Sequence, residues 1–370
     1  MYTEEDFLNF ANGEGGLIDA MDMSTNNSIT AKNVERKFKE LTEMLHYAYE
    51  EEARDWIASL RLVWINNSAI NAVAFPTTNC CYIALYMGVV ERLKLVFFST
   101  LLHPFPFSEL FQDLVWSKEI SWDHLTQFII DTVTGDNLPS ETILQIEREI
   151  DLPSYCEHKS IALELYDLSV DFILIHEIQH FWLGHIYALS DSHGMFITEA
   201  PINKQSFNEY SLRRMMEVHA DIYASRHAFM LIQFLDGHDQ SKAAQKWWVS
   251  IAIFFMALEP NPVQYSLWNM EQYPHPHLRL ASLFNYSQVE VQRLGFSDEE
   301  ASANFKKWVN VLTRIEALTK GKVIFPFMQM INSKDYFDSE INGWTNKLKS
   351  EIDDLEKSKS IMIEHFRTIS

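Results

Sequence analysis

The sequence has 370 residues, of which 47% are hydrophobic and 13% aromatic. This much apolar material can bury a sizeable core, so the composition excludes a disordered or a fibrous protein. Asp and Glu number 51 and Lys and Arg 30, which gives a formal net charge of −21. Because so acidic a surface repels a phosphate backbone, we expect no nucleic-acid partner. Gly and Pro number only 11 each, which favours long helices over a many-turned sheet.

Cysteine content and apolar segments bear on the compartment of the protein. The three cysteines, Cys80, Cys81 and Cys156, are too few for a disulfide framework, so we expect reduced thiols. The first residues are acidic and lack the basic start of a secretory signal. The longest uncharged apolar run, Trp247–Leu258, spans about 18 Å as a helix, short of a membrane core of about 30 Å. These features predict a cytoplasmic protein without a membrane partner.

The first hundred residues carry two kinds of pattern. Residues 1–33 are polar and turn-rich, and we expect a loosely held lead-in there. Apolar positions three and four apart predict a helix over 34–60. Short β-branched and aromatic runs separated by turn residues then predict a small antiparallel sheet. Its strands are expected at 62–65, 72–75 and 81–85, and a helix at 89–101 follows.

Helical patterns dominate the rest of the chain. Residues 100–159 hold two helical patches between breakers, and a long helix is expected from Ser160 to Tyr187. Further helices are expected at 210–234, 241–258, 276–288 and 297–319, and a charged amphipathic helix at 335–370. The predicted fold is α+β and mostly α, with a main domain over 34–334.

The strongest chemical signal is an HExxH motif, His176-Glu177-Ile-Gln-His180, on the predicted long helix. A spacing of four places both imidazoles on one helix face, where they can reach a single Zn²⁺. Glu177 lies beside them and can take a proton from water without binding the metal. The motif therefore predicts a zinc site with one Zn²⁺ per chain.

Zinc needs a third protein ligand, and Glu217-Val-His-Ala-Asp221 offers one on a separate predicted helix. The two carboxylates are one turn apart on the same face. Glu217 can bind zinc while Asp221 accepts the free N–H of a ligand histidine. Gly184, four residues after His180, is expected to continue the helix face and let another helix approach the metal closely.

An HExxH followed by a helical ExxxD resembles the gluzincin zinc metallopeptidases. Within that clan the chain is similar to the family of the CAAX prenyl proteases and heat-shock membrane proteases, through Ile70–Pro76, Tyr82–Gly88 and Val89–Leu93. A compact relative with similar motif spacing is the phage-exclusion peptidase Lit. The resemblance covers residues 34–99 and 160–290, and it implies a gluzincin-like fold with a two-helix zinc site.

The chain departs from this family in two places. Residues 100–159 form an insertion without a match. The family's downstream His-Pro-(x)₄-Arg element appears as Tyr273-Pro-His-Pro-His-Leu-Arg279, with a tyrosine six residues before the arginine. Any of Tyr273, His275 or His277 can donate a hydrogen bond to a tetrahedral oxyanion, and we favour His275. Arg279 is a candidate substrate contact, and a solvated proline-rich turn is the alternative for the whole element.

Three further histidines lie near these motifs. His185 is five residues after His180, about 140° round a helix, so we expect a polar supporting contact and no ligation. His219 and His227 flank the third-ligand segment, and we expect them to be packed or hydrogen-bonded.

The resemblance implies a zinc-dependent endopeptidase that cleaves peptide bonds of a protein substrate. The alternative is a catalytically silent, zinc-stabilised interaction module, and an accidental motif on a helical scaffold is a third interpretation. An intact Glu177 favours the enzyme, because a structural zinc site has no use for a base beside the metal.

Regulation and substrate binding are also expected from the sequence. Likeness to Lit implies a latent protease that a trigger, such as phage infection or a partner protein, switches on. We expect Cys81–Leu85 to be an exposed edge strand to which an extended peptide pairs. The 100–159 insertion is expected to act as a lid, and the helix at 335–370 to cover the cleft or to form an oligomer.

Overall fold

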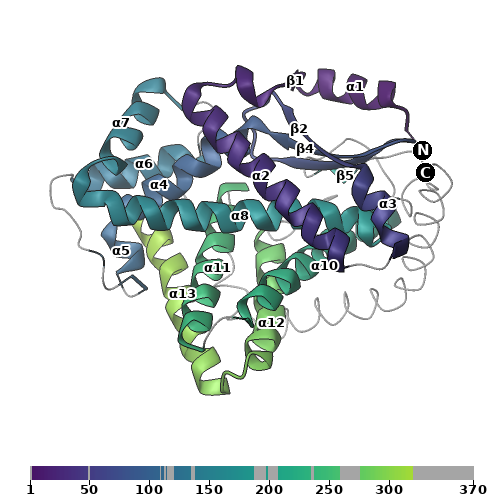
Figure 1. Ribbon diagram of the computed structural model, residues 1–370. Coiled ribbons are helices and arrows are strands. Elements are labelled where there is room, and N and C mark those ends of the chain that lie inside the picture. The colour runs from purple at the N-terminus through teal and green to yellow at the C-terminus, as the bar shows by residue number, and fades with distance from the viewer. Residues whose placement is uncertain are drawn as a thin grey trace. The chain divides into compact units, whose positions relative to one another are not determined.

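The computed structural model describes most of the chain as two compact units (Figure 1). The described residues are 2–48, 51–108, 110–111, 114, 121–134, 138–186, 197–198, 207–234, 237–258 and 276–319. The first unit comprises the described parts of Met1–Glu91 and Ile173–Ala224, and the second those of Arg92–Phe172 and Ser225–Ser339. The helix expected at 335–370 lies outside the described residues.

The first unit is built on a five-stranded sheet in the order β1-β2-β4-β3-β5. The strands are β1 (Leu17–Ile18), β2 (Leu60–Ile65), β3 (Ala72–Pro76), β4 (Cys81–Tyr86) and β5 (Ile197–Thr198). β3 and β4 form an antiparallel hairpin, but β2 pairs with β4 in parallel, so the sheet is mixed and the prediction of an antiparallel sheet is wrong.

The parallel pair follows from the connection between β2 and β3. Residues 66–71 connect β2 to β3, which are not neighbours in the sheet. β4 lies between them and pairs with both. This connection lies against Gly88, where an added Cβ would stand only 2.1 Å from the carbonyl oxygen of Ala69. Gly88 therefore allows a close backbone approach that any larger residue would block.

β4 occupies the interior of the sheet and contradicts the expected exposed edge strand at Cys81–Leu85. Cys81, Ile83 and Leu85 are fully buried, and β4 is paired along both sides. A run without charges is typical of a central strand, and the sequence alone does not distinguish it from an exposed edge that binds a peptide. Among the described strands, β1 and β5 form the edges of the sheet.

Residues 2–33 form defined helical and strand elements, in contrast to the loosely held lead-in expected there. Helix α1 (Glu4–Gly13) begins with a capping box in which Thr3 and Asp6 bond each other's backbone N–H groups. Phe7 and Ala11 on its inner face are buried against the sheet residues Val73 and Phe75. The segment η1 (Ala20–Asp22) and helices α2 (Thr25–Ala48) and α3 (Glu51–Ser59) follow.

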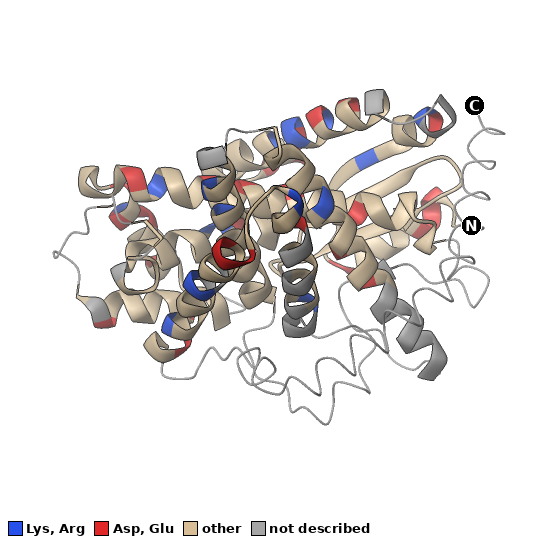
Figure 2. Cartoon of the chain, turned by 90° about the horizontal axis from the view of Figure 1, so that it is seen from below, with Lys and Arg blue, Asp and Glu red and all other residues tan. Residues whose placement is uncertain are grey.

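Basic and acidic residues are interspersed along the helices (Figure 2). On α2, Arg36 and Lys39 each pair with a glutamate one turn on, Glu40 at 3.0 Å and Glu43 at 3.8 Å. Within the described part of the chain, no helix has both the length and the apolar character needed to cross a membrane.

The second unit is helical and has the buried helix α4 (Lys94–Leu102) in its core. The π-helical turn η2 (Val89–Leu93) leads into α4, and α6 (Trp122–Thr134) and α7 (Ser140–Ile150) pack against it. Ser99 and Thr132 share a buried 2.8 Å hydrogen bond between α4 and α6. Much of the segment 100–159 therefore belongs to the core of this unit.

The predicted later helices are confirmed with small shifts of their ends. They are α8 (Cys156–Trp182), α10 (Phe207–Ile232), α11 (Gly237–Leu258), α12 (Pro276–Arg293) and α13 (Asp298–Leu318), with the short α5 (Pro104–Phe107) and η3 (Pro153–Tyr155) before them. In the second unit α11 packs against α12 and α13 (Figure 1). The protein is thus a mostly helical α+β fold, as the sequence predicts.

Candidate metal centre

The HExxH motif lies on the last two turns of α8, within the first unit. Every residue from Ile173 to Phe181 is buried. His176 and His180 are one turn apart, and their Nε2 atoms face each other at 3.0 Å. The helix therefore presents two imidazole nitrogens to one point, as the spacing of four requires.

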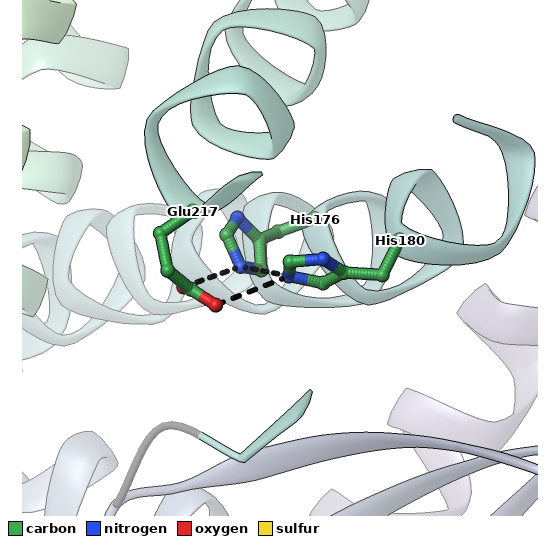
Figure 3. Close-up of side chains that lie close together, drawn as sticks. All are labelled: His176, His180 and Glu217. Carbon is green, nitrogen blue, oxygen red and sulfur yellow. Dashed lines mark hydrogen bonds and ion pairs between the residues drawn. The ribbon is translucent and has the colours of Figure 1, made fainter. Parts of the chain in front are cut away.

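Glu217 joins the two histidines from α10 (Figure 3). Its Oε2 atom stands 3.3 Å from Nε2 of His176, and its Oε1 atom 3.5 Å from Nε2 of His180. The ligand atoms of these three buried residues all lie within 4.8 Å of one another. Two helices far apart in the sequence thus bring two nitrogens and a carboxylate to one buried place.

The dimensions of this triangle fit a tetrahedral zinc ion. Ligands bonded at about 2.0–2.1 Å to a tetrahedral Zn²⁺ stand about 3.3–3.4 Å apart. The three observed separations are 3.0, 3.3 and 3.5 Å. Two histidines and a glutamate are also a ligand set found in catalytic zinc sites, where a fourth position stays open. The group could therefore hold a metal ion by both its geometry and its donor chemistry.

Asp221 lies one turn after Glu217 on α10 and contacts the opposite side of His176. Its Oδ1 atom stands 2.8 Å from Nδ1 of His176, and both side chains are almost fully buried. A carboxylate at this distance favours the tautomer of His176 that carries its proton on Nδ1 and keeps the lone pair of Nε2 free for a metal. This is the contact expected of Asp221 from the sequence.

Glu177 follows His176 directly on α8 and is 1% exposed. Three carboxylates, those of Glu177, Glu217 and Asp221, are therefore buried in the two helices that form the site. Burial of a carboxylate is unfavourable unless hydrogen bonds or a cation compensate it. The concentration of acidic groups in this place favours a bound cation.

α8 ends at Trp182, five residues before the expected end at Tyr187. Gly184 has φ of +72°, in the left-handed region that favours glycine, and terminates the helix. The expectation that Gly184 continues the helix face is therefore wrong. Since Gly184 is a glycine just beyond the last apolar turn, the stop signal was present in the sequence.

The turn at Gly184 brings His185 back toward the site. Nδ1 of His185 stands 2.9 Å from Nδ1 of His180, and Nε2 of His185 stands 3.2 Å from Nδ1 of His219. The expected supporting contact of His185 and the hydrogen bond of His219 are confirmed. The geometric reason given for His185 was wrong, because the helix ends before it.

Burial keeps these supporting histidines neutral. It lowers the pKa of His185 well below its ordinary value, and the neighbouring His180, His219 and His176 add to the effect. Burial also lowers the pKa of His219 to about 4. His227, further along α10, has its pKa lowered by burial as well, which agrees with the packed position expected for it.

The candidate oxyanion segment, residues 273–279, is only partly described by the structure. Tyr273 and His275 lie outside the described residues, and so does the side chain of His277, although its backbone begins α12. Arg279 on α12 is 3% exposed, and its guanidinium lies 5.1 Å from the centre of the Phe255 ring. Both residues belong to the second unit.

Residues 137–296 match the family described as Peptidase U49. Over this region the chain is similar to the Peptidase U49 family. The match contains the HExxH motif, Glu217, Asp221 and residues 273–279. The comparisons with curated proteins and with solved structures gave no match.

The likeness to U49 over residues 137–296 indicates a protease, and the buried His-His-Glu group implies a metallopeptidase. The matched region begins at residue 137, so it takes in the end of the segment 100–159, which the sequence comparison had left unmatched. It does not reach the segment 34–99, on which part of the likeness to the CAAX protease family rests.

Proposed function

We propose that this protein is a zinc-dependent endopeptidase. His176, His180 and Glu217 would bind one Zn²⁺ per chain, and Glu177 would be the general base. The observation that carries the proposal is the buried triangle of two Nε2 atoms and one carboxylate, with separations of 3.0, 3.3 and 3.5 Å. The buried Glu177, directly after His176 on α8, supports an enzyme over a purely structural site, which has no use for a base.

The reaction follows from the roles of these side chains. A bound Zn²⁺ supplies a Lewis acid that makes water nucleophilic near neutral pH and polarises the scissile carbonyl. The Glu177 carboxylate accepts the proton of the attacking water and passes it to the nitrogen of the leaving amine. Asp221 holds His176 so that Nε2 faces the other ligands.

A hydrogen-bond donor for the tetrahedral oxyanion completes the proposal. His275 is our first candidate, and Tyr273 and His277 are the alternatives from the same segment. Arg279 would contact the substrate or the transition state. Replacing each of Tyr273, His275 and His277 by phenylalanine separates them, since only the true donor should lower kcat while zinc content stays constant.

Glu177→Gln tests the mechanism. The variant should retain zinc and fold but lose turnover by at least about 10³-fold, because the base is lost and the ligands are not. The matched control is Glu164→Gln, the same change on the same helix at a residue paired with Lys246. Activity of Glu177→Gln comparable to wild type would refute the role of Glu177.

His180→Ala and Glu217→Ala test the ligands separately from the base. Both variants should lose zinc as well as activity, as measured by metal analysis of protein purified without chelator. If Glu217→Ala binds zinc as tightly as wild type, the third ligand lies elsewhere.

The competing proposal is a zinc-stabilised interaction module without catalysis. Both proposals predict bound zinc, but only the enzyme predicts that Glu177→Gln changes the products in the cell. Less than about half an equivalent of zinc in the purified wild type would contradict both and favour a helical scaffold with an accidental motif.

We further propose that the protease acts in the cytoplasm on a protein substrate and is latent until triggered. The peptidase family supports a protein substrate, and free cysteines at Cys80, Cys81 and Cys156 agree with a reducing compartment. Residues 335–370 or part of 100–159 would cover the cleft until a partner, or a second copy, binds the open form better.

N-terminal proteomics of cells that express wild type or Glu177→Gln tests latency. A single dominant new N-terminus on triggering supports a selective, latent protease, whereas many scattered cuts indicate a general one. Deletion of 100–159 is not a suitable test of the lid, because α6 and α7 within it pack against the buried α4.

A further inference from the structure

A row of three buried imidazoles leads away from the metal centre. Nδ1 of His180 stands 2.9 Å from Nδ1 of His185, and Nε2 of His185 stands 3.2 Å from Nδ1 of His219. His180, His185 and His219 are 0%, 0% and 8% exposed. All three belong to the first unit, and the left-handed turn at Gly184 places the middle ring.

The protons of this row can be assigned from the chemistry of imidazole. A neutral ring carries one N–H and one lone pair. If Nε2 of His180 is to bind a metal, its proton must lie on Nδ1, and Nδ1 of His185 must accept it. His185 then carries its proton on Nε2 and donates it to Nδ1 of His219. One assignment thus satisfies every contact in the row.

The opposite assignment is incompatible with metal binding. If His185 donated from Nδ1, the His180 proton would lie on Nε2, the atom that faces His176 and Glu217. The row therefore distinguishes a metal-competent state of His180 from one that cannot bind.

We propose that His185 and His219 are positioning residues that hold His180 in the tautomer and orientation that binds zinc. This inference rests on the proposed zinc site and deepens it. His219 acts through His185, and neither residue is a ligand: the group of described residues that could hold a metal consists of His176, His180 and Glu217.

The two ligand histidines then differ in the charge of their partners. His176 is held by the carboxylate of Asp221, whereas His180 is held by a neutral imidazole. Glu177, Glu217 and Asp221 already bury three carboxylates in these helices, and a fourth would add another unfavourable buried charge. A neutral acceptor supplies the hydrogen bond without that cost.

Zinc affinity of the full-length chain tests the proposal without any assay of proteolysis. In His185→Phe the ring volume is kept and the acceptor is lost, so zinc affinity should fall about 10- to 100-fold in competition with a chromophoric chelator. In His185→Asn the amide oxygen takes the place of Nδ1, and affinity should return to within about 5-fold of wild type. His219→Phe should have a smaller effect in the same direction, and His227→Phe on α10 is the control that should have none.

Two further readouts separate positioning from general support of the fold. The visible spectrum of the Co²⁺-loaded chain should change in His185→Phe and stay near wild type in His185→Asn. The rise in Tm caused by zinc should shrink in His185→Phe, whereas a structural role alone would lower Tm equally with and without zinc.

Several results would overturn the inference. Equal zinc affinity of wild type and His185→Phe would do so, as would an Asn variant as weak as the Phe variant, because the acceptor would then not matter. If His185→Phe does not fold, the zinc affinities of His185→Asn and His219→Phe are compared with that of wild type. The expected order of affinity is wild type, then His185→Asn, then His219→Phe. A wild-type chain that binds no zinc would overturn the proposed function itself, which is a distinguishable outcome.

Discussion

Removal of the Asp221 carboxylate tests how the metal centre is held, independently of any cleaved peptide. Oδ1 of Asp221 stands 2.8 Å from Nδ1 of His176, and the two side chains are 1% and 2% exposed. In Asp221→Ala the Nδ1–H group loses this acceptor. The His176 ring can then turn, or take the tautomer whose Nε2 carries the proton and cannot bind metal. We therefore expect weaker zinc binding.

The size of the effect can be worked out. Loss of a hydrogen bond to a ligand histidine typically weakens metal affinity about 10- to 100-fold, or about 1.4–2.7 kcal/mol. When the free zinc concentration is far above the dissociation constants of wild type and of Asp221→Ala, zinc stabilises the variant less than wild type by this amount of free energy. For a chain of 370 residues the entropy of unfolding is about 0.8 kcal/mol per kelvin, so the zinc-dependent rise in Tm should shrink by about 2–3.5 °C.

Thermal scans in buffered zinc and in EDTA measure this difference, and chelator competition measures the affinity directly. Asp221→Asn is the matched control: its amide oxygen can still accept the Nδ1 proton, so the loss should be smaller than in the alanine variant. If Asp221→Ala binds zinc as tightly as wild type and keeps the full rise in Tm, the carboxylate does not hold His176 in the way the geometry implies.

Four other outcomes are expected. A chelator should lower the Tm of wild type and leave that of Glu217→Ala unchanged in thermal scans, because the variant has no zinc to lose. Gly184→Ala should cost about 1–2 kcal/mol in urea unfolding, since φ of +72° is unfavourable for a residue with Cβ, and should also weaken zinc binding by displacing the ring that follows. Ser297→Ala removes the capping hydroxyl of α13 and should cost about 1 kcal/mol in the same assay. Burial lowers the pKa of His158 to about 4, below its ordinary 6.5, so the unfolded chain binds more protons between these values. Wild type should therefore lose stability as pH falls through that window, and His158→Gln should lose less when urea unfolding is compared at pH 7 and pH 5.

The metal centre was predictable because its geometry is local to each helix. A spacing of four fixes the relation of His176 to His180, and the same spacing fixes that of Glu217 to Asp221. What the spacing leaves open is which helices meet. The pairing of α8 with α10 was inferred from the chemical need for a third ligand and from the resemblance to gluzincins.

The sheet was less predictable, because strand order depends on contacts between distant residues. The short apolar runs locate β2, β3 and β4 within one or two residues. These runs do not indicate that β4 lies between β2 and β3. The predicted antiparallel sheet instead pairs strands that are neighbours in the sequence. The uncharged, mostly apolar run Cys81–Leu85 is the signal of a central strand that the sequence offers.

The sequence also contains signals for the start of α1 and the end of α8, although the surrounding composition points to other structures. Thr3 and Asp6 have the spacing of a capping box, and Phe7 and Ala11 fall on one face four residues apart. The acidic and glycine-rich surroundings favoured a loop interpretation instead. In the same way Gly184 marked the end of α8, while continued apolar residues after it suggested a longer helix.

The charges of the centre connect its construction to its chemistry. Glu177, Glu217 and Asp221 are each 1% exposed, and uncompensated carboxylates in such a place are strongly unfavourable. A divalent cation held by His176, His180 and Glu217 would offset two of these three charges. The supporting imidazole at His185 adds none, so the site with the proposed metal would keep a single negative charge. In the proposed reaction that charge is needed, because Glu177 must be ionised to accept a proton from water. The neutral partner of His180 and the charged partner of His176 are thus parts of one charge balance, which leaves the base free to act.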